Sequence, residues 1–171
     1  MSHEIRTPMN AIIGMTELCL GTNPSPQQRN YLSKIQQTSD LLLRIINDIL
    51  DFSKIESGKL SIEKHPFDIN QVLDDVGNLL SAKAGKKQIE IIFEIDETCH
   101  RSFLGDRLRL EQILINLLGN AIKFSGRGNV IVRARAENTG TETARLSFDV
   151  IDEGIGISTE QQARLFSPLK L

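Results

Sequence analysis

Apolar residues recur at intervals of three and four along the first third of the chain, a pattern that predicts two helices. We expect the first helix over residues 2 to about 21, before the break at Pro24-Ser25-Pro26. The second helix is expected to start at Pro26, capped by Ser25, and to run to about Ser57, where Gly58 closes it. Its apolar residues form two stripes, one of Leu32, Ile35, Leu42, Ile46 and Ile49 and another of Leu41, Ile45, Phe52 and Ile55.

Two apolar stripes on one helix need more than one neighbouring helix. The first stripe steps by threes and fours, with Ser39 in its gap, as a heptad repeat does. A single hairpin cannot cover both stripes, so two chains associating into a four-helix bundle is the economical solution. A bundle within one chain would need further helices of similar length, which the remaining sequence does not provide. We therefore predict a homodimer.

After the joint at residues 58–66, which includes His65 and Pro66, helical and strand patterns are mixed. A helix capped by Asn70 is expected to reach about Ala84, before Gly85. A third helix is expected over residues 108–124, and its expected face toward the sheet consists of Leu110, Ile113, Leu117 and Ala121. Strands are predicted at residues 89–95 and 103–104, followed by a hairpin of residues 129–137 and 144–151.

These patterns predict an α+β chain with two parts. Residues 1–64 form the helical hairpin, and residues 65–171 form the part that contains the strands. The net charge of −2 gives no basic face for nucleic acid or for anionic lipid. No apolar run approaches the roughly 20 residues that span a bilayer, so we expect no membrane contact within this segment.

The cysteine content bears on the compartment. Cys19 and Cys99 are the two cysteines of the chain, and they do not make a disulfide framework. A reducing, cytoplasmic setting is therefore expected. The chain could equally be the cytoplasmic part of a membrane-bound sensor.

Polar residues on the third predicted helix suggest a binding surface. Asn116, Asn120 and Lys123 are four and three residues apart, so they share one face. Amide oxygens suit a hard cation such as Mg²⁺, and an ammonium group suits nucleotide phosphates. An ordinary solvated helix face explains the same pattern, and the helix alone does not decide between the two.

A glycine-rich loop follows the last predicted strand. Asp152 ends the strand, and Gly154 and Gly156 let the backbone approach a flat ligand closely. The carboxylate can accept a hydrogen bond from an exocyclic amine such as that of adenine. A simple strand-exit turn has the same composition, so the loop gains weight only from its position after the helix with Asn116 and Asn120.

The segment Ser2-His3-Glu4-Ile5-Arg6-Thr7-Pro8 opens the first helix with an imidazole beside a carboxylate. Together with the two segments above, it resembles the transmitter core of two-component sensor histidine kinases. Residues 2–8 are similar to the phosphoacceptor box, residues 116–124 to the N box, and residues 152–156 to the first glycine box. Residues 165–168 are similar to the start of the phenylalanine box. The sequence around His3 resembles that of hybrid kinases, which carry attached receiver domains.

The resemblance implies a dimeric four-helix bundle followed by an α/β-sandwich ATP-binding domain of the GHKL (Bergerat) type. It implies ATP-dependent phosphorylation of His3, then transfer to an aspartate of a response-regulator receiver domain. Glu4 would orient or deprotonate the imidazole, and Thr7 would help to place a water that dephosphorylates the regulator.

For the nucleotide, the resemblance implies that Asn120 binds Mg²⁺, with Asn116 and Lys123 beside the ion and the phosphates. Asp152 would read adenine. The remaining residues implied at this ATP site are Phe124, Gly154 and Gly156. Related ATPases of the chaperone and repair type carry a glutamate where Asn116 stands and lack the His3 box, so that function is disfavoured.

The family's ATP-binding domain continues through a lid, a second glycine box, a helix and two strands, which this chain does not contain. We expect a fragment with reduced grip on the phosphates. Two functions follow from this expectation: a histidine kinase core, or a dimeric phosphotransfer and docking module that an intact kinase phosphorylates.

Overall fold

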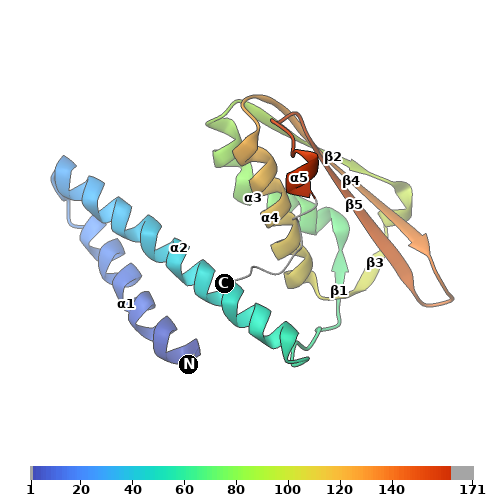
Figure 1. The fold of residues 1–171 in the computed structure, drawn as a ribbon, viewed down its shortest axis with the longest axis horizontal. Coiled ribbons are helices and arrows are strands. Elements are labelled where there is room, and N and C mark those ends of the chain that lie inside the picture. Colours follow the sequence, from blue (N-terminus) through green and yellow to red (C-terminus); the bar gives the residue numbers. More distant parts are fainter. Residues whose placement is uncertain (1, 163–171) are drawn as a thin grey trace. The chain divides into compact units, whose positions relative to one another are not determined.

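The computed structural model describes residues 2–162 and contains two compact units (Figure 1). The first unit ends at Ser61 and the second begins at Ile62. The expected boundary between residues 64 and 65 lies three residues further along the chain. Each unit is described by itself below.

The first unit is a hairpin of two helices, α1 (Ser2–Leu20) and α2 (Pro26–Glu56). Ser25 caps α2 as expected: its Oγ accepts a hydrogen bond from the Gln28 N–H at 3.3 Å, and the Gln28 side chain accepts one from the Ser25 N–H at 2.8 Å. Gly58 has the positive φ of 64° that suits the end of a helix. Both predicted helices are confirmed to within two residues.

One row of α2 side chains is shielded in the hairpin, at positions spaced by four and three: Leu32, Gln36, Ser39, Leu43, Ile46 and Leu50. The first predicted stripe is therefore divided. Leu32 and Ile46 belong to the shielded row, whereas Ile35, Leu42 and Ile49 are 45–59% exposed. Two polar contacts also join the helices, from Arg6 to Asn47 at 3.4 Å and from Gln36 to Glu17 at 3.3 Å.

The second unit contains a three-stranded sheet in the order β2-β4-β5. β2 (Ile89–Ile95) pairs in parallel with β4 (Gly128–Asn138), and β4 pairs antiparallel with β5 (Ala144–Asp152). α3 (Ile69–Gly85) and α4 (Arg107–Phe124) pack against this sheet (Figure 1). A smaller sheet pairs β1 (His65–Asp68) with β3 (Ser102–Gly105), and two short helices, η1 (Glu97–Cys99) and α5 (Thr159–Gln162), complete the described elements.

The core of this unit lies between the two helices and β4. Its most deeply buried residues are Ile69, Val72, Leu73, Val76, Leu114, Leu118, Ile122, Val130 and Val132. The predicted face of α4 was wrong at two positions, because Ile113 and Leu117 are 57% and 42% exposed. The buried face is rotated toward Leu114 and Leu118.

The start of this unit also differs from the prediction. His65 and Pro66 lie in β1, not in an unstructured joint. Pro66 is tolerated because β1 pairs on one side only, with β3, among the residues that the structure describes. α3 is capped by Asp68, not by Asn70: Asp68 has an extended backbone, and its Oδ1 accepts a hydrogen bond from the Asn70 N–H at 2.7 Å.

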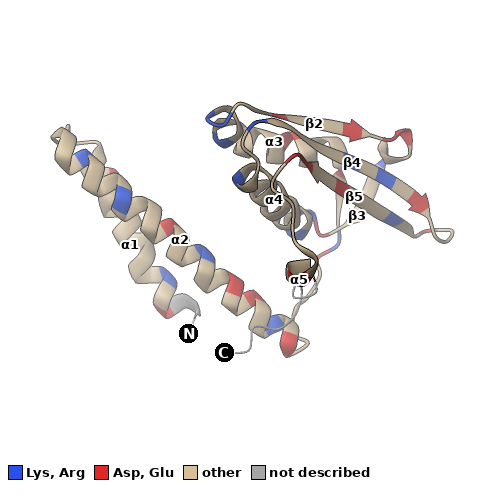
Figure 2. Cartoon of the chain, turned by 45° about the horizontal axis from the view of Figure 1, so that its top comes forward, with Lys and Arg blue, Asp and Glu red and all other residues tan. Residues whose placement is uncertain are grey.

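Within residues 2–162, no helix combines the length and the apolar character that a membrane span requires. Acidic and basic residues are interspersed along α2 and over the second unit (Figure 2).

Candidate functional site

The polar stripe of α4 is present and faces solvent. Asn116, Asn120 and Lys123 are all exposed on one side of the helix, as their spacing predicted. The Lys123 Nζ also lies 5.0 Å from the centroid of the Phe124 ring, which is 50% exposed. Two amides, an ammonium group and an aromatic ring are thus gathered on the C-terminal half of α4.

The N-terminal end of α4 is held by charged partners. The Asp106 carboxylate caps the helix, since its Oδ1 accepts a hydrogen bond from the Arg109 N–H at 3.1 Å. Arg107 bonds Glu111 one turn along at 2.5 Å and also pairs with Asp75 of α3. These contacts anchor the helix that presents Asn116 and Asn120.

Asp152 stands at the end of β5 and organises the loop that follows. Its Oδ1 accepts a hydrogen bond from the Gly154 N–H at 2.8 Å. Gly154 has no room for a side chain: a Cβ there would lie 2.5 Å from Asp152 Oδ1 and 3.0 Å from the Phe124 carbonyl oxygen. Gly156 has a φ of 69°, a left-handed conformation that favours glycine.

The loop and α4 therefore meet. The Asp152 carboxylate and the Phe124 carbonyl both lie beside Gly154: a Cβ there would be 2.5 Å from the first and 3.0 Å from the second. Because Phe124 ends α4 directly after Lys123, the carboxylate and the polar stripe belong to one continuous surface. The contact brings the loop of Asp152 to Phe124, and Asn120 and Asn116 lie one and two turns further back along α4.

The phosphoacceptor segment is described only in part. His3 lies in the first turn of α1, but its side chain is outside the described part of the structure. Glu4 and Thr7 are exposed, and Pro8 lies inside the helix. The phenylalanine-box residues 165–168 are also outside the described residues.

The candidate site is an open surface. A pocket of about 760 Å³ in the second unit lies between α4, β3 and the start of β5, with Phe103, Leu110 and Leu146 in its lining. It contains none of the predicted site residues, so we place the site by the contact at Gly154. Among residues 2–162 no group of three or more His, Cys, Asp and Glu side chains is arranged to hold a metal ion.

The residues of this surface nevertheless fit ATP and Mg²⁺ chemically. Amide oxygens of Asn116 and Asn120 are hard ligands for the cation, and the Lys123 ammonium suits a phosphate. The Asp152 carboxylate accepts hydrogen bonds, and the space beside Gly156 is open, since a Cβ there would meet no atom within 4 Å.

Two protein families match the chain. Residues 1–58 match the family described as "His Kinase A (phospho-acceptor) domain", and residues 105–171 match "Histidine kinase-, DNA gyrase B-, and HSP90-like ATPase". The chain belongs to the sensor histidine kinase family. Its relatives include proteins named as hybrid signal transduction histidine kinases.

Individual relatives support this membership. The signal transduction histidine-protein kinase BarA of Escherichia coli K12 is 42% identical over 170 residues, which are 99% of this chain and 18% of BarA. Among solved structures, full-length ShkA in complex with AMPPNP matches with a TM-score of 0.78 and 36% identity, over 97% of this chain and 35% of ShkA. The histidine kinase ThkA in complex with the response regulator protein TrrA matches with a TM-score of 0.56 and 28% identity, over 99% and 48% of the two chains.

The family membership confirms the predicted fold, a helical hairpin followed by an α/β ATP-binding domain. The chain spans about a fifth of the length of the curated relatives, since it covers 18% of BarA. One contact of the site was not predicted from the sequence at all: the Lys87 side chain bonds the C-terminal end of α4. No motif marks Lys87, which is one of two adjacent lysines in a turn.

Proposed function

We propose that the chain is the core of a kinase that phosphorylates itself on His3 with ATP and passes the phosphoryl group to a receiver aspartate. The observation that carries this proposal is the contact of Gly154 with the C-terminal end of α4. This contact lies next to the Phe124 carbonyl, one residue after Lys123. It supports a site in which the Asp152 carboxylate reads adenine and Lys123 binds phosphate.

At the nucleotide end, Asp152 accepts a hydrogen bond from the adenine amine, and Gly154 and Gly156 shape the backbone around the base. Asn120 would hold Mg²⁺, which would neutralise phosphate charge, and Asn116 and Lys123 would lie beside the ion and the phosphates. An amide at position 116 is no base, so it does not activate water. This favours transfer to histidine over hydrolysis.

At the phosphoacceptor end, His3 takes the γ-phosphoryl group on Nε2. The new N–P bond forms as the bond from phosphorus to the β–γ bridging oxygen breaks, and ADP leaves with that oxygen. Glu4 orients the ring and accepts its remaining proton, which keeps the imidazole nucleophilic. Thr7 helps to place the water that later removes the phosphoryl group from the regulator.

The first unit is proposed to form a homodimer. A second heptad row on α2, which we name the open seam, is solvent-exposed in the single chain and consists of Tyr31, Ile35, Thr38, Leu42, Ile45, Ile49 and Phe52. It lies beside the row that the hairpin shields, and α1 adds exposed Ile5, Ile12 and Met15. A second hairpin that covers these residues completes a four-helix bundle.

The proposed partner for phosphotransfer is the receiver domain of a response regulator, as in the ThkA–TrrA complex. The proposed location of this core is the cytoplasm, where ATP and receiver domains are available.

Incubation of the chain with Mg²⁺ and ATP labelled at the γ position tests the proposal. We expect a label that is stable in base and lost in acid, as phosphohistidine is, and that is absent from the His3→Gln variant. The His65→Gln variant is the matched control and should retain the label, because His65 is an exposed residue of β1 in the second unit.

Three other outcomes are informative. A label that persists in the His3→Gln variant contradicts the assignment of the phosphoacceptor. A label that appears on His3 only after an intact kinase is added supports the alternative function, a phosphotransfer and docking module. No label under either condition contradicts both functions.

A further inference from the structure

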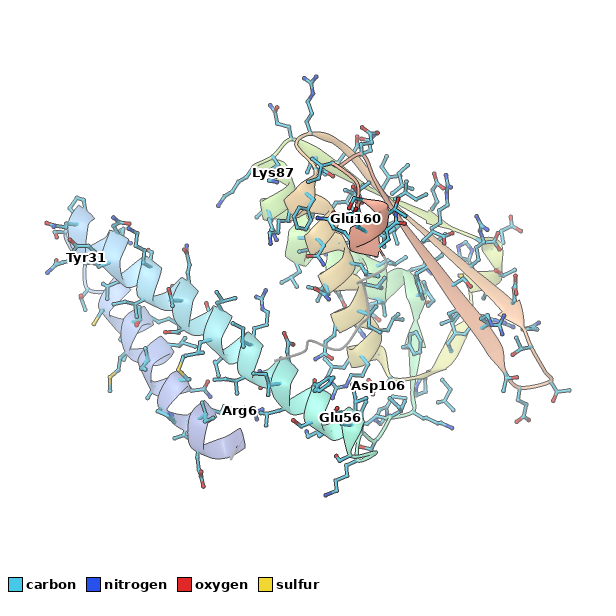
Figure 3. All side chains as sticks on the ribbon, in the orientation of Figure 1. Arg6, Tyr31, Glu56, Lys87, Asp106 and Glu160 are labelled. Carbon is cyan, nitrogen blue, oxygen red and sulfur yellow. The ribbon has the colours of Figure 1, made fainter. Side chains whose placement is uncertain are left out.

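Lys87 lies in the turn between α3 and β2, beside the end of α4 (Figure 3). Its Nζ donates hydrogen bonds to the carbonyl oxygens of Ile122 at 2.9 Å, Lys123 at 2.6 Å and Ser125 at 3.0 Å. All three N–H donors of the ammonium group therefore have an acceptor. The acceptors are two carbonyls in the last turn of α4 and that of Ser125 directly after the helix, where a helix carries partial negative charge.

The same backbone segment supports the loop of Asp152. The Phe124 carbonyl, which lies between the carbonyls that Lys87 binds, is the group that approaches Gly154. The Glu153 side chain packs against Gly128, a glycine with a φ of 103° that leaves room for this carboxylate. Residues 124–128 are thus the support on which the loop of residues 152–154 rests.

The turn that presents Lys87 is itself unusual. Gln88 has a φ of 55°, which is uncommon for a residue with a side chain. Lys87 is half-buried, whereas its neighbour Lys86 is exposed. The two lysines therefore differ in role although they are adjacent, and the difference follows from the three carbonyls.

We propose that Lys87 is a positioning residue for the adenine-binding loop of residues 152–156. It fixes the end of α4, the end of α4 fixes Gly154, and Gly154 sets the place of the Asp152 carboxylate. The proposal rests on the proposed function, since it assumes that this loop reads adenine. Lys87 itself touches no nucleotide, because its donors are taken up by the backbone.

This role predicts how substitutions change the affinities for ADP and ATP. A substitution that moves the loop weakens binding of the base, which ADP and ATP have in common. Disturbing Lys123, on the exposed stripe, weakens the grip on the phosphates, where ADP and ATP differ. The ratio of the two affinities therefore separates a residue that acts through the loop from one that contacts phosphate.

The test is titration of the 171-residue chain and its variants with Mg·ADP and Mg·ATP, followed by calorimetry or by displacement of a fluorescent nucleotide. Lys87→Met keeps most of the side-chain volume and removes the donors. We expect Lys87→Met to lower the affinity for both nucleotides by the same factor, about tenfold. A loss of this size is usual for residues that orient a binding group without touching the ligand. Lys87→Arg keeps the charge and several donors and should recover most of the affinity, and Lys86→Met should leave it unchanged.

A loss of stability is separated from a loss of positioning by Val76→Ala, a core variant on α3 whose melting temperature and affinity are measured alongside those of Lys87→Met. Val76 is 1% exposed and lies in the core against which α3 packs, so its truncation should lower the melting temperature and leave nucleotide affinity unaltered. Equal losses in Val76→Ala and Lys87→Met would show that Lys87 acts only on stability, and would overturn the proposal.

The remaining outcomes distinguish the two proposals. Binding by the unmodified chain with no change in Lys87→Met overturns the role of Lys87 and leaves the proposed function in place. A larger loss for ATP than for ADP in Lys87→Met means that Lys87 serves the phosphates, which also overturns it. No binding by the unmodified chain contradicts the proposed function, and the role of Lys87 falls with it.

Discussion

Gly154 is the residue on which the contact between the loop and α4 depends. Alanine at this position would place its Cβ 2.5 Å from Asp152 Oδ1 and 3.0 Å from the Phe124 carbonyl oxygen, so the loop would have to move. We expect Gly154→Ala to lower nucleotide affinity by at least about tenfold, because a displacement of about 1 Å is costly for a positioned group. The thermal midpoint should change little, because the loop lies outside the buried core.

The control for this substitution is Gly126→Ala, in the segment that supports the loop. A Cβ at Gly126 meets no atom within 4 Å, so this variant should bind nucleotide as the unmodified chain does. Equal affinity in both variants would contradict the role of the Gly154 contact.

Gln88 offers a second test at the scale of one residue. Its left-handed backbone costs a residue with a Cβ about 1–2 kcal/mol, and glycine avoids that cost while losing some chain entropy on folding. Gln88→Gly should therefore raise the free energy of unfolding by about 0.5–1 kcal/mol. Urea denaturation measures this, and Gln88→Ala, which keeps the Cβ, should show no gain. A gain in both variants would indicate a cause other than backbone conformation.

Some of these residues were identifiable from the sequence and others were not. Asp152, Gly154 and Gly156 were singled out because they follow the helix of Asn116 and Asn120 along the chain. The loop alone would not have sufficed, since a strand-exit turn has the same composition. Lys87 was missed because its acceptors are main-chain carbonyls 35–38 residues away, which leave no trace in the sequence.

Among the elements, α4 shows how far periodicity reaches. Its bounds were predicted to within one residue, but its buried face was not. Apolar residues lie on several sides of this helix, so spacing alone admits more than one face. The buried side is decided by contact with Val130 and Val132 of β4, which are fully buried in the same core as Leu114 and Leu118. A similar ambiguity explains the cap of α3, since Asp68 and Asn70 both form good caps.

The helix caps also predict how the stability of the second unit depends on pH. The pKa of Asp106 is lowered by its hydrogen bond from the Arg109 N–H and, to a lesser extent, by one from the Glu63 N–H. The pKa values of Asp68 and Asp96 are lowered by hydrogen bonds from Asn70 and Thr98. Folding therefore favours the ionised form of all three carboxyl groups.

Because these pKa values are depressed in the folded state, their contribution is complete above the unfolded-state value of about 3.9. It is lost as the pH falls through the lower folded-state values. Urea denaturation between pH 6 and pH 3 should show a free energy of unfolding that declines at the acid end of this range. In Asp106→Asn the decline should be shallower, and an unchanged slope would contradict a role for this cap.

At the scale of the whole molecule, the sequence predicted two parts because the apolar period changes near residue 60. The segments of the candidate site could be proposed from the sequence, because three motifs occur along the chain in the order that is typical of the family. The contact between Gly154 and Phe124 was not predictable, because it depends on how α4 packs against the hairpin of β4 and β5, and the spacing of residues did not give that packing. The sequence showed that α2 has more apolar positions than one neighbouring helix can cover. Which of them belong to the shielded row and which to the open seam became clear only from the structure of the hairpin.

The open seam makes the oligomeric state a direct test of the first unit. Leu42 and Ile45 are each 45% exposed at its centre, and replacing both with glutamate puts two charges where a second hairpin would pack. Each lost side chain removes about 1.5–3 kcal/mol of apolar burial, so the dimer dissociation constant should rise by at least about 100-fold. Light scattering after gel filtration should then give the mass of one 19.1 kDa chain in place of two. Leu104→Glu, at a residue of β3 that is 67% exposed, is the matched control and should remain dimeric. A monomeric unmodified chain, or a Leu42→Glu/Ile45→Glu variant that stays dimeric, would contradict association through this seam.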